Sequence, residues 1–254
     1  MKKQTIILGI AGLTFAGLSS CNSSDTTFSK EVEKEENVKS DSTALVDQTE
    51  PDVVEAFDPA KVDLPEGYVL FDSDRGDLNG DGVDDFVLMV KGTDPEEWKK
   101  NQFDETVDRN RRGILVYLSE GKKMNLVVEN LDCFSSENED GGVYFPPELS
   151  MEIEKGRLFL HYGHGRYGYW RYNFRYQDGK MKLIGFDQSE NMGPVVHYLS
   201  SYNFLTGKKQ EKENINFYSE NPENEVFKET WSDLPKKELI TLSSIEDFDE
   251  LYFD

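Results

Sequence analysis

Oxygen-bearing side chains alternate along the acidic stretch DLNGDGVDDF, which runs from Asp77 to Phe86. Oxygens at alternate positions, followed by a glycine at Gly82, are the pattern of a loop that wraps around a cation. The expected ligands are carboxylate, amide and backbone carbonyl oxygens, at Asp77, Asn79, Asp81, Val83 and Asp85. Hard oxygen ligands favour Ca²⁺, and we expect the ion to hold two strands together. The alternative is a turn whose Asp and Asn side chains bind their own backbone amides.

The surrounding residues exclude one class of calcium loop and favour another. An EF-hand loop ends in a bidentate Glu at its twelfth position, where this chain has Leu88. The stretch GDLNGDGVDDFVLMV, residues 76–90, resembles instead the DxNxDGxxD loop of FG-GAP and VCBS-type repeats, which lies between two strands of extracellular β modules. That resemblance implies the same five ligand residues. Propellers of this kind contain many such repeats, so the single copy found here predicts that the fold is not a full propeller.

A second candidate site lies in the stretch LHYGHGRYGYWRYNFRYQ, residues 160–177. Alternate residues of a strand share a face, so the even-numbered side chains from 170 to 176 are expected in the core. The odd-numbered ones from 169 to 175 would form a cationic and aromatic strip that could stack on a sugar or pair with a carboxylate. The candidate binding patch comprises Tyr162, Arg166, Tyr167, Tyr169, Trp170 and Arg171. The alternative is that these arginines pair with acids on neighbouring strands.

Two histidines in the same stretch, with His197 far along the chain, raise the question of a zinc site. Residues three apart on a strand point to opposite faces, so His161 and His164 converge only if Gly163 and Gly165 bend the chain. The sequence has no spaced Cys pair and no HExxH motif to complete a ligand set. We therefore expect packing or surface histidines.

The elements that position these residues are expected to be antiparallel strands. The segment Glu120–Lys123 separates two apolar runs, residues 113–118 and 124–128, and predicts a hairpin. Lys155-Gly156 and Asp178-Gly179 are turn dipeptides between alternating runs, and a further hairpin tip is expected in residues 204–210. Connections this short suit a meander, because parallel strands need long crossovers. The expected fold class is α+β, mostly antiparallel β, arranged as a curved sheet or a sandwich-like meander.

One helix is expected to cover the sheet near residues 95–112. Asp94 could cap its first turn, Pro95 suits that turn, and Glu97 stands where a capping box has its acid. An imperfect apolar stripe and a basic C-terminal end complete the pattern, at Trp98, Phe103, Val107, Arg109, Arg111 and Arg112. Gly113 would then end the helix.

The N-terminal sequence MKKQTIILGIAGLTFAGLSSC has the basic start, apolar run and small residues of a secretory signal peptide. Its last four residues, Leu18-Ser19-Ser20-Cys21, resemble the lipobox of bacterial lipoprotein precursors. The resemblance implies cleavage before Cys21 and attachment there of several acyl chains, such as palmitate, which together hold a protein on a membrane. The alternative is an ordinary signal peptide with an incidental cysteine. The wider chain resembles single-repeat lipoproteins of Gram-negative bacteria such as the Bacteroidota, so we expect a lipid-anchored envelope protein of the outer membrane.

Composition divides the chain into three expected parts: a signal peptide (1–20), the lipidated Cys21 with a disordered acidic tether (21–57), and a single β-rich domain (58–254). The net charge of −22 predicts no nucleic-acid partner and favours divalent cations and basic partners. Once Cys21 is acylated, Cys133 has no partner, so no intramolecular disulfide is expected. Cys133 ends an apolar run and is expected to be a small buried hydrophobe.

The sequence contains no nucleophile elbow, phosphate loop or dinucleotide fingerprint. The expected function is a lipid-anchored binding or scaffolding module of the cell envelope, stabilised by one Ca²⁺ ion, with a glycan or a protein as its ligand. Two alternatives stay open at this point: a hydrolase acting on envelope or other glycans, and an inhibitor or immunity-type protein.

Overall fold

The computed structural model describes residues 58–121, 123–139 and 148–253. The chain divides into two units, residues 1–52 and 53–254, and every described residue belongs to the second. The expected signal peptide, the lipidation site Cys21 and the tether lie outside the described residues, so they stay predictions. Among the described residues there is no helix long and apolar enough to cross a membrane.

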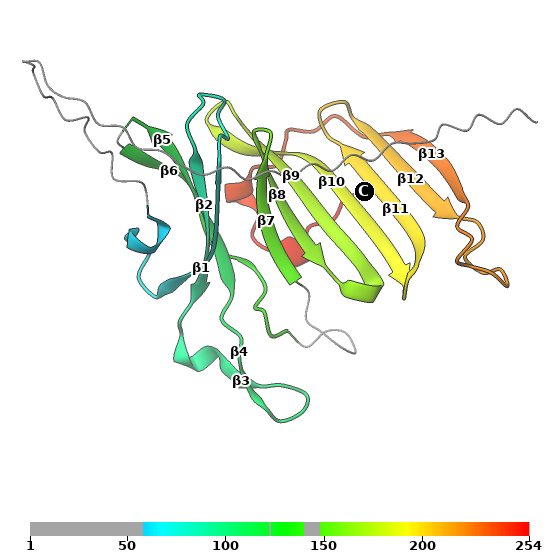
Figure 1. Ribbon diagram of the computed structural model, residues 1–254, viewed down its shortest axis with the longest axis horizontal. Helices are drawn as coiled ribbons and strands as arrows, with labels where there is room; N and C mark the ends of the chain where they lie inside the picture. Colours follow the sequence, from blue (N-terminus) through cyan, green and yellow to red (C-terminus); the bar gives the residue numbers. More distant parts are fainter. Residues whose placement is uncertain (1–57, 122, 140–147, 254) are drawn as a thin grey trace, which may run out of the picture. The chain divides into compact units, whose positions relative to one another are not determined.

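The first half of the described chain forms a four-stranded antiparallel sheet with the strand order β1-β2-β5-β6 (Figure 1). Its strands are β1 (Tyr68–Gly76), β2 (Asp85–Gly92), β5 (Arg112–Glu120) and β6 (Lys123–Phe134). The first six residues of β2 are all buried, because both faces of this sheet are covered. One face belongs to the main core, and Val62 and Leu64, which follow the 3-10 turn η1 (Pro59–Lys61), pack against the other.

The second half forms a seven-stranded antiparallel meander, in which each strand pairs with the next one along the chain (Figure 1). Its strands are β7 (Glu148–Glu154), β8 (Arg157–Gly163), β9 (Gly168–Gln177), β10 (Lys180–Met192), β11 (Val195–Asn203), β12 (Lys208–Asn214) and β13 (Phe227–Asp233). The 3-10 turn η3 (Gly165–Tyr167) joins β8 to β9. The prediction of mostly antiparallel β structure is therefore confirmed, and the described strands close into no barrel.

The turn dipeptides close hairpins of this sheet as the sequence predicts. Lys155 and Gly156 both have positive φ, at 51° and 72°, and so do Asp178 and Gly179, at 52° and 75°. Two successive residues with positive φ form the tight turn whose twist matches that of the flanking strands. These turns fix the register of β7 against β8 and of β9 against β10, and hence which side chains become neighbours.

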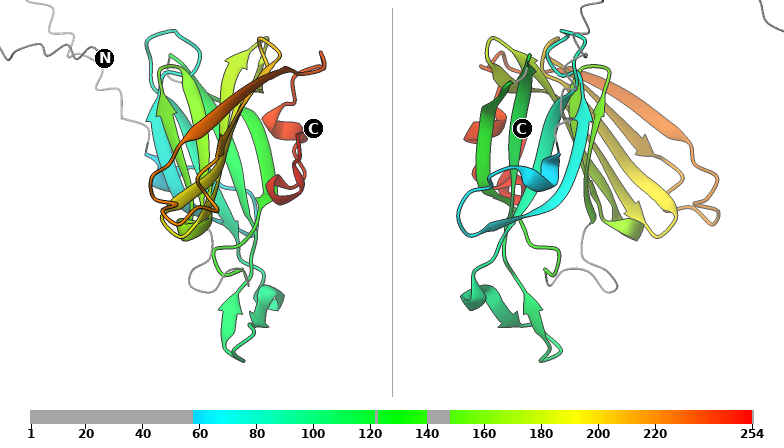
Figure 2. Two further views of the ribbon diagram at one scale, coloured as in Figure 1. Left: turned by 90° about the vertical axis from the view of Figure 1, so that its right-hand side faces the viewer. Right: turned by 60° about the vertical axis from the view of Figure 1, so that its left-hand side comes forward.

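The two sheets share one hydrophobic core, which the C-terminal segment completes. Phe248, 1% exposed, lies in the 3-10 turn η5 (Phe248–Glu250), with its ring centroid 4.7 Å from that of Phe134 and 4.8 Å from that of Tyr172. The turn η4 (Leu242–Ser244) contacts both β6 and β10. In both views of Figure 2 the red C-terminal segment lies beside β6. This core supports the inner face of β7 to β10 and leaves their outer face open.

Cys133 is fully buried at the end of β6, which confirms the prediction of a small buried hydrophobe. Burial raises the pKa of its thiol far above the ordinary range, because a thiolate would lose its hydration. A buried thiol held in the neutral form is a poor nucleophile, so Cys133 belongs to the core and not to a reactive site.

The prediction of a helix near residues 95–112 is wrong. The chain forms only the 3-10 turn η2 (Pro95–Glu97) there, followed by a two-stranded sheet of β3 (Trp98–Lys100) and β4 (Thr106–Asp108). The cap itself is present, because the Asp94 carboxylate accepts the amide of Glu96 at 2.9 Å.

The segment after η2 turns back because of one side chain. The amide oxygen of Asn101 accepts the backbone amides of Phe103 and Glu105, both at 2.9 Å, and Asp104 adopts a positive φ of 63°. Trp98 and Phe103 are 55% and 73% exposed, so the expected stripe has no apolar surface to pack on. A short helix without tertiary packing is marginal, and the local turn prevails.

Candidate functional site

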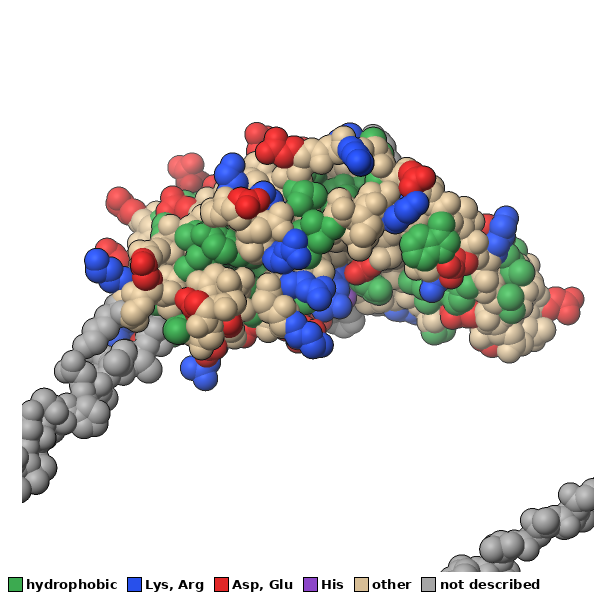
Figure 3. Space-filling view, turned by 90° about the horizontal axis from the view of Figure 1, so that it is seen from above, with side chains coloured by type: hydrophobic (Ala, Val, Ile, Leu, Met, Phe, Trp, Pro, Cys, Tyr) green, Lys and Arg blue, Asp and Glu red, His purple; other side chains and the backbone are tan. Residues whose placement is uncertain are grey.

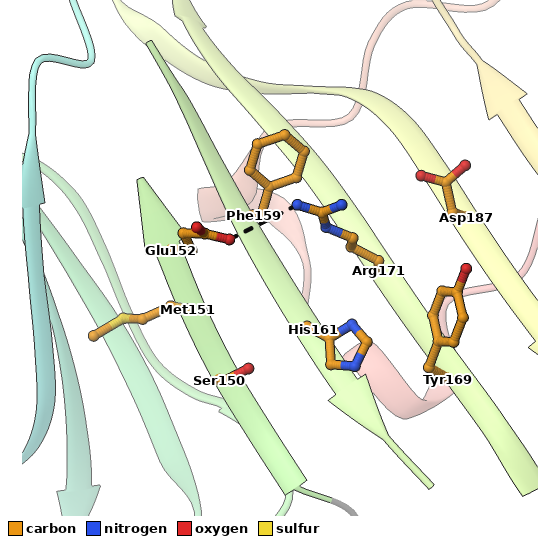
Figure 4. Close-up of a pocket in the computed structure, with 8 residues that line it drawn as sticks. All are labelled: Ser150, Met151, Glu152, Phe159, His161, Tyr169, Arg171 and Asp187. Atoms are coloured by element: carbon orange, nitrogen blue, oxygen red, sulfur yellow. Dashed lines mark ion pairs between the residues drawn. The ribbon is translucent and has the colours of Figure 1, made fainter. Parts of the chain in front are cut away.

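A hollow of about 400 Å³ lies on the open face of the seven-stranded sheet, over β7, β8, β9 and β10. Its lining combines aromatic, cationic, acidic and hydroxyl side chains, from Ser150, Met151, Glu152, Phe159, His161, Tyr169, Arg171 and Asp187. Figure 4 shows that these side chains come from four adjacent strands and that the arginine lies between the two acids. Pockets of this size that gather a few polar groups are the usual place for ligand binding.

Cross-strand register gathers the polar side chains of the hollow into one row. Ser150 pairs with His161, His161 with Arg171, Arg171 with Asp187, and Asp187 with Ser201 on β11. Partners directly opposite each other project from the same face of a sheet and lie within contact distance. Five successive strands therefore each contribute one polar side chain to a single line.

Arg171 stands at the middle of the row with its guanidinium carbon 4.0 Å from the ring centroid of Phe159. Its nearest acid is Glu152, whose Oε2 lies 3.9 Å from Nη2, and the Glu152 side chain is 64% exposed. An exposed ion pair at that separation contributes little to stability. The guanidinium thus keeps hydrogen-bond donors for a ligand while the aromatic ring holds its plane.

His161 and Tyr169 stack beside the arginine, with ring centroids 5.2 Å apart. Burial, and then the positive charge of Arg171, lower the pKa of His161, so its imidazole is neutral at pH 7 and offers both a donor and an acceptor. Burial, and then the negative charge of Asp187, raise the pKa of Tyr169, so its hydroxyl keeps its proton. The Asp187 carboxylate is oriented by Ser201, whose hydroxyl donates to it at 2.6 Å.

The structure divides the six residues of the predicted binding patch between different surroundings. Alternation along β9 is confirmed: Tyr172 and Phe174 are buried in the core, whereas Tyr169 and Arg171 line the hollow. Tyr162 is fully buried, so its side chain is not part of an exposed patch.

The other three patch residues lie at the end of β8 and the start of β9. The half-buried Trp170 belongs to the core side, where its ring centroid is 4.3 Å from that of His164. Arg166 and Tyr167 are exposed on the turn η3, outside the hollow.

Six of the lining residues are absent from the sequence-based patch: Ser150, Met151, Glu152, Phe159, His161 and Asp187. The alternation of β8 could have placed Phe159 and His161 on the open face, since Leu158, Leu160 and Tyr162 of that strand are all buried. The acids could not be found in this way, because only the pairing of β7 and β10 with their neighbours brings them to Arg171.

The acidic loop joins β1 to β2, as the calcium-loop resemblance implies. Asp77 accepts the amides of Gly80 and Gly82 at 2.6 and 2.9 Å, and these two contacts lower its pKa. Asn79 accepts the amide of Asp81 at 2.9 Å. Asp81 in turn accepts the amide of Val83 at 2.8 Å. Each of these oxygens is thus used by the loop's own backbone.

Asp85, the last of the five expected ligands, is buried, unlike Asp77, Asn79 and Asp81. Asp85 is fully buried at the start of β2, where its two oxygens accept the amides of Leu78 and Ser119 at 2.8 and 2.9 Å. Burial raises its pKa, against the effect of the two amides. Within the described residues no three His, Cys, Asp or Glu side chains converge as a metal site would require.

The loop nevertheless has the chemistry of a hard-cation site. A carboxylate oxygen has two lone pairs, so each oxygen of Asp77 that accepts one amide keeps one pair for a cation. Asp77, Asn79 and Asp81 therefore fit Ca²⁺ in donor type, while Asp85 would contribute from inside the sheet.

The chain was compared with protein-family models and with curated proteins. Neither comparison finds a match. The resemblance to FG-GAP and VCBS-type loops therefore rests on the residues around Asp77 alone, and the function has to be argued from the site.

Proposed function

We propose that this chain is a lipid-anchored binding module of the bacterial cell envelope, and that its ligand lies across the open face of the seven-stranded sheet. The observation that carries the proposal is the in-register row Ser150, His161, Arg171, Asp187 and Ser201. A purely structural sheet face exposed to water needs no such convergence of hydroxyl, imidazole, guanidinium and carboxylate groups around aromatic rings.

The ligand class follows from the direction and chemistry of the row. Strands lie about 4.8 Å apart, so the four steps from Ser150 to Ser201 span about 19 Å across the sheet. The row continues in register through Gln210 on β12 to Trp231 on β13, whose side chain is 59% exposed. An extended chain with many hydroxyl groups, that is, a glycan, matches both this length and the combination of hydrogen-bonding groups with rings.

Arg171 favours a glycan that carries carboxylates, although Glu152 and Asp187 give the hollow one more acid than base. The chain has a net charge of −22, yet Lys and Arg side chains gather in the middle of the surface seen from above in Figure 3. In the hollow, Arg171 is the group that can bind a carboxylate with two parallel hydrogen bonds. Its weak pairing with Glu152 leaves it available for this role.

A lipid anchor and a calcium ion would support the binding face. Acylation of Cys21 would hold the module at the outer membrane, and the residues between it and the domain would let the open face reach ligands around it. Calcium bound at Asp77, Asn79 and Asp81 would fasten the start of β2 to the end of β1 and thereby stabilise the domain.

A glycan array tests this function on residues 22–254, which lack the signal peptide and the cysteine that would be acylated. We expect retention of glycans that contain uronic or sialic acids, weaker retention of their neutral counterparts, and no change in the glycans that are retained. Release of shortened products would instead show a hydrolase, with Glu152 and Asp187 as the acids in the hollow. Equal retention of neutral and acidic glycans, or retention of none, would contradict the proposal.

A further inference from the structure

A second cavity, of about 420 Å³, opens at another end of the same domain and has different chemistry. Its lining comes from the tip between β11 and β12, the segment after β13, the C-terminal residues and Leu183 of β10. The apolar lining residues are Leu183, Phe204, Leu205, Leu234, Pro235, Leu239, Ile240, Tyr252 and Phe253. None of these residues belongs to the hollow around Arg171.

The rear of this cavity is continuous with the hydrophobic core. The ring centroid of Phe253 lies 5.0 Å from that of Phe204 and 4.8 Å from that of Phe186, and Phe204 and Phe253 both pack against the core. The mouth, in contrast, has apolar side chains in water: Leu205 is 48% and Tyr252 is 81% exposed. Single exposed apolar side chains are common, but here they border one apolar cavity, which is typical of a binding site.

One wall of the cavity is a strap, residues 234–240, that follows β13 and leads back toward the C-terminal turns (Figure 1). The strap is fastened at both ends: the amide of Leu234 donates to Gly207 at 2.9 Å, and the amide of Leu183 donates to the Ile240 carbonyl at 2.8 Å. Between these points, residues 235–239 make no backbone hydrogen bond with another backbone group of the described chain. The wall can therefore move outward without breaking a sheet.

The strap also places two cations at the rim. Lys236 and Lys237 line the cavity, are exposed, and form no ion pair within the described residues. Glu238 beside them leaves the rim with a surplus of one positive charge, on a chain whose net charge is −22. An apolar interior below unpaired ammonium groups is complementary to a molecule with a long apolar tail and a negatively charged head.

We propose that this cavity binds one free long-chain fatty acid, with its hydrocarbon chain between Phe204 and the strap and its carboxylate at Lys236 and Lys237. Each methylene removed from water contributes to binding, so affinity should rise with chain length until the cavity is filled. This site is independent of the glycan proposal, because the two cavities share no residue.

The test uses residues 22–254, which lack the signal peptide and the cysteine that would be acylated. This chain is titrated calorimetrically with three twelve-carbon probes, each below the concentration at which it aggregates. We expect dodecanoate to bind with one-to-one stoichiometry and at least about tenfold more tightly than dodecanol or dodecyltrimethylammonium. Decanoate, two methylenes shorter, should bind about 15-fold more weakly than dodecanoate. Absence of saturable dodecanoate binding, or equal affinity for the cationic probe, would overturn the proposal.

Two variants locate the site, and a third provides the control. Lys236→Glu with Lys237→Glu should reduce dodecanoate affinity to that of dodecanol or below, and Leu205→Glu at the mouth should weaken both probes. The matched control is Lys180→Glu with Lys228→Glu, which changes the net charge equally at exposed positions outside the cavity and should leave affinity within twofold. If the control pair weakens dodecanoate as much as the strap pair, or Leu205→Glu has no effect, the cavity is not the binding site.

Discussion

The guanidinium of Arg171 on β9 lies over the ring of Phe159 on β8, 4.0 Å from its centroid, on the open face of a seven-stranded sheet. These two residues are not direct cross-strand partners, since Phe159 pairs with Asn173 and Arg171 with His161. The arginine therefore reaches diagonally across the ladder, a distance that a long side chain can span. The contact holds the cation in the middle of the polar row, where the proposed ligand would bind.

Calcium should stabilise the domain through the loop between β1 and β2. Saturation at about 100 times the dissociation constant corresponds to about 2.7 kcal/mol, because the ion binds the folded loop and not the unfolded chain. We expect millimolar Ca²⁺ to raise the melting temperature and Asp81→Ala to abolish that rise. Asp84→Ala, an exposed acid of the same loop outside the ligand set, is the matched control. A melting temperature that responds neither to Ca²⁺ nor to EDTA would show that the loop is only a turn.

Asp85→Ala should destabilise the domain even without calcium. The substitution leaves the buried amides of Leu78 and Ser119 without acceptors, which costs about 2–4 kcal/mol in the free energy of unfolding. Denaturant titration in EDTA measures this cost, and Asp84→Ala in the same medium should change the free energy by less than about 0.5 kcal/mol. Equal effects of the two substitutions would mean that the buried carboxylate does not hold the loop to β5.

The stability of the domain should fall as the pH decreases below about 6.5, the usual pKa of an unfolded histidine. Burial lowers the pKa of His164, whose Nε2 is buried without a hydrogen-bond partner, and burial also lowers that of His161. The unfolded chain then binds protons that the folded chain does not, so acidification favours unfolding until the pH passes the lowered folded pKa.

His164→Phe should reduce this pH dependence, because an aromatic ring that cannot be protonated can keep the edge-on contact with Trp170. Free energies of unfolding at pH 7.5 and pH 5.5, for the wild-type and substituted chains, give the comparison. An unchanged difference between the two pH values would assign the effect to other groups.

Replacing residues 1–21 with an ordinary cleavable signal peptide that ends in Ala instead of Cys should release the chain from membranes. Acyl chains on Cys21 would supply the membrane affinity, since the charge of −22 repels anionic headgroups. Fractionation of cells that express each form should place the wild-type chain with membranes and the variant in the soluble fraction. The lipid anchor is excluded if both forms occur in the same fraction.

Local patterns predicted the strands and turns of the meander well. Positive φ at Asp178 and Gly179 follows from a dipeptide, and the burial of Tyr172 and Phe174 follows from a period of two, because both are properties of neighbours in sequence. The same patterns indicated a helix near residues 95–112, where the cap at Asp94 is present but no surface is available for Trp98 to pack on. A capping motif can begin a helical turn, but a short helix is stable only where its apolar face packs on other residues.

The candidate site could be predicted only in part. Tyr169 and Arg171 follow from alternation within one strand, whereas Glu152 and Asp187 join them through the register of two further pairs of strands. Register depends on turn lengths and on the fit of the whole core, so it is not visible in any single stretch of sequence. Tyr162 was predicted to belong to the binding patch because it lies among glycines, but it is fully buried.

The most direct test of the central claim measures the dissociation constant of the strongest acidic glycan from the array for three chains. Arg171→Ala should weaken binding about tenfold or more, since it removes the charged fork at the centre of the row, and Arg171→Lys should restore only part of the affinity. Arg175→Ala, on the same face of β9 but bonded to Gln177, is the matched control and should stay within twofold of the wild type. If Arg171→Ala binds as tightly as the wild type, the open face of the sheet is not the binding surface.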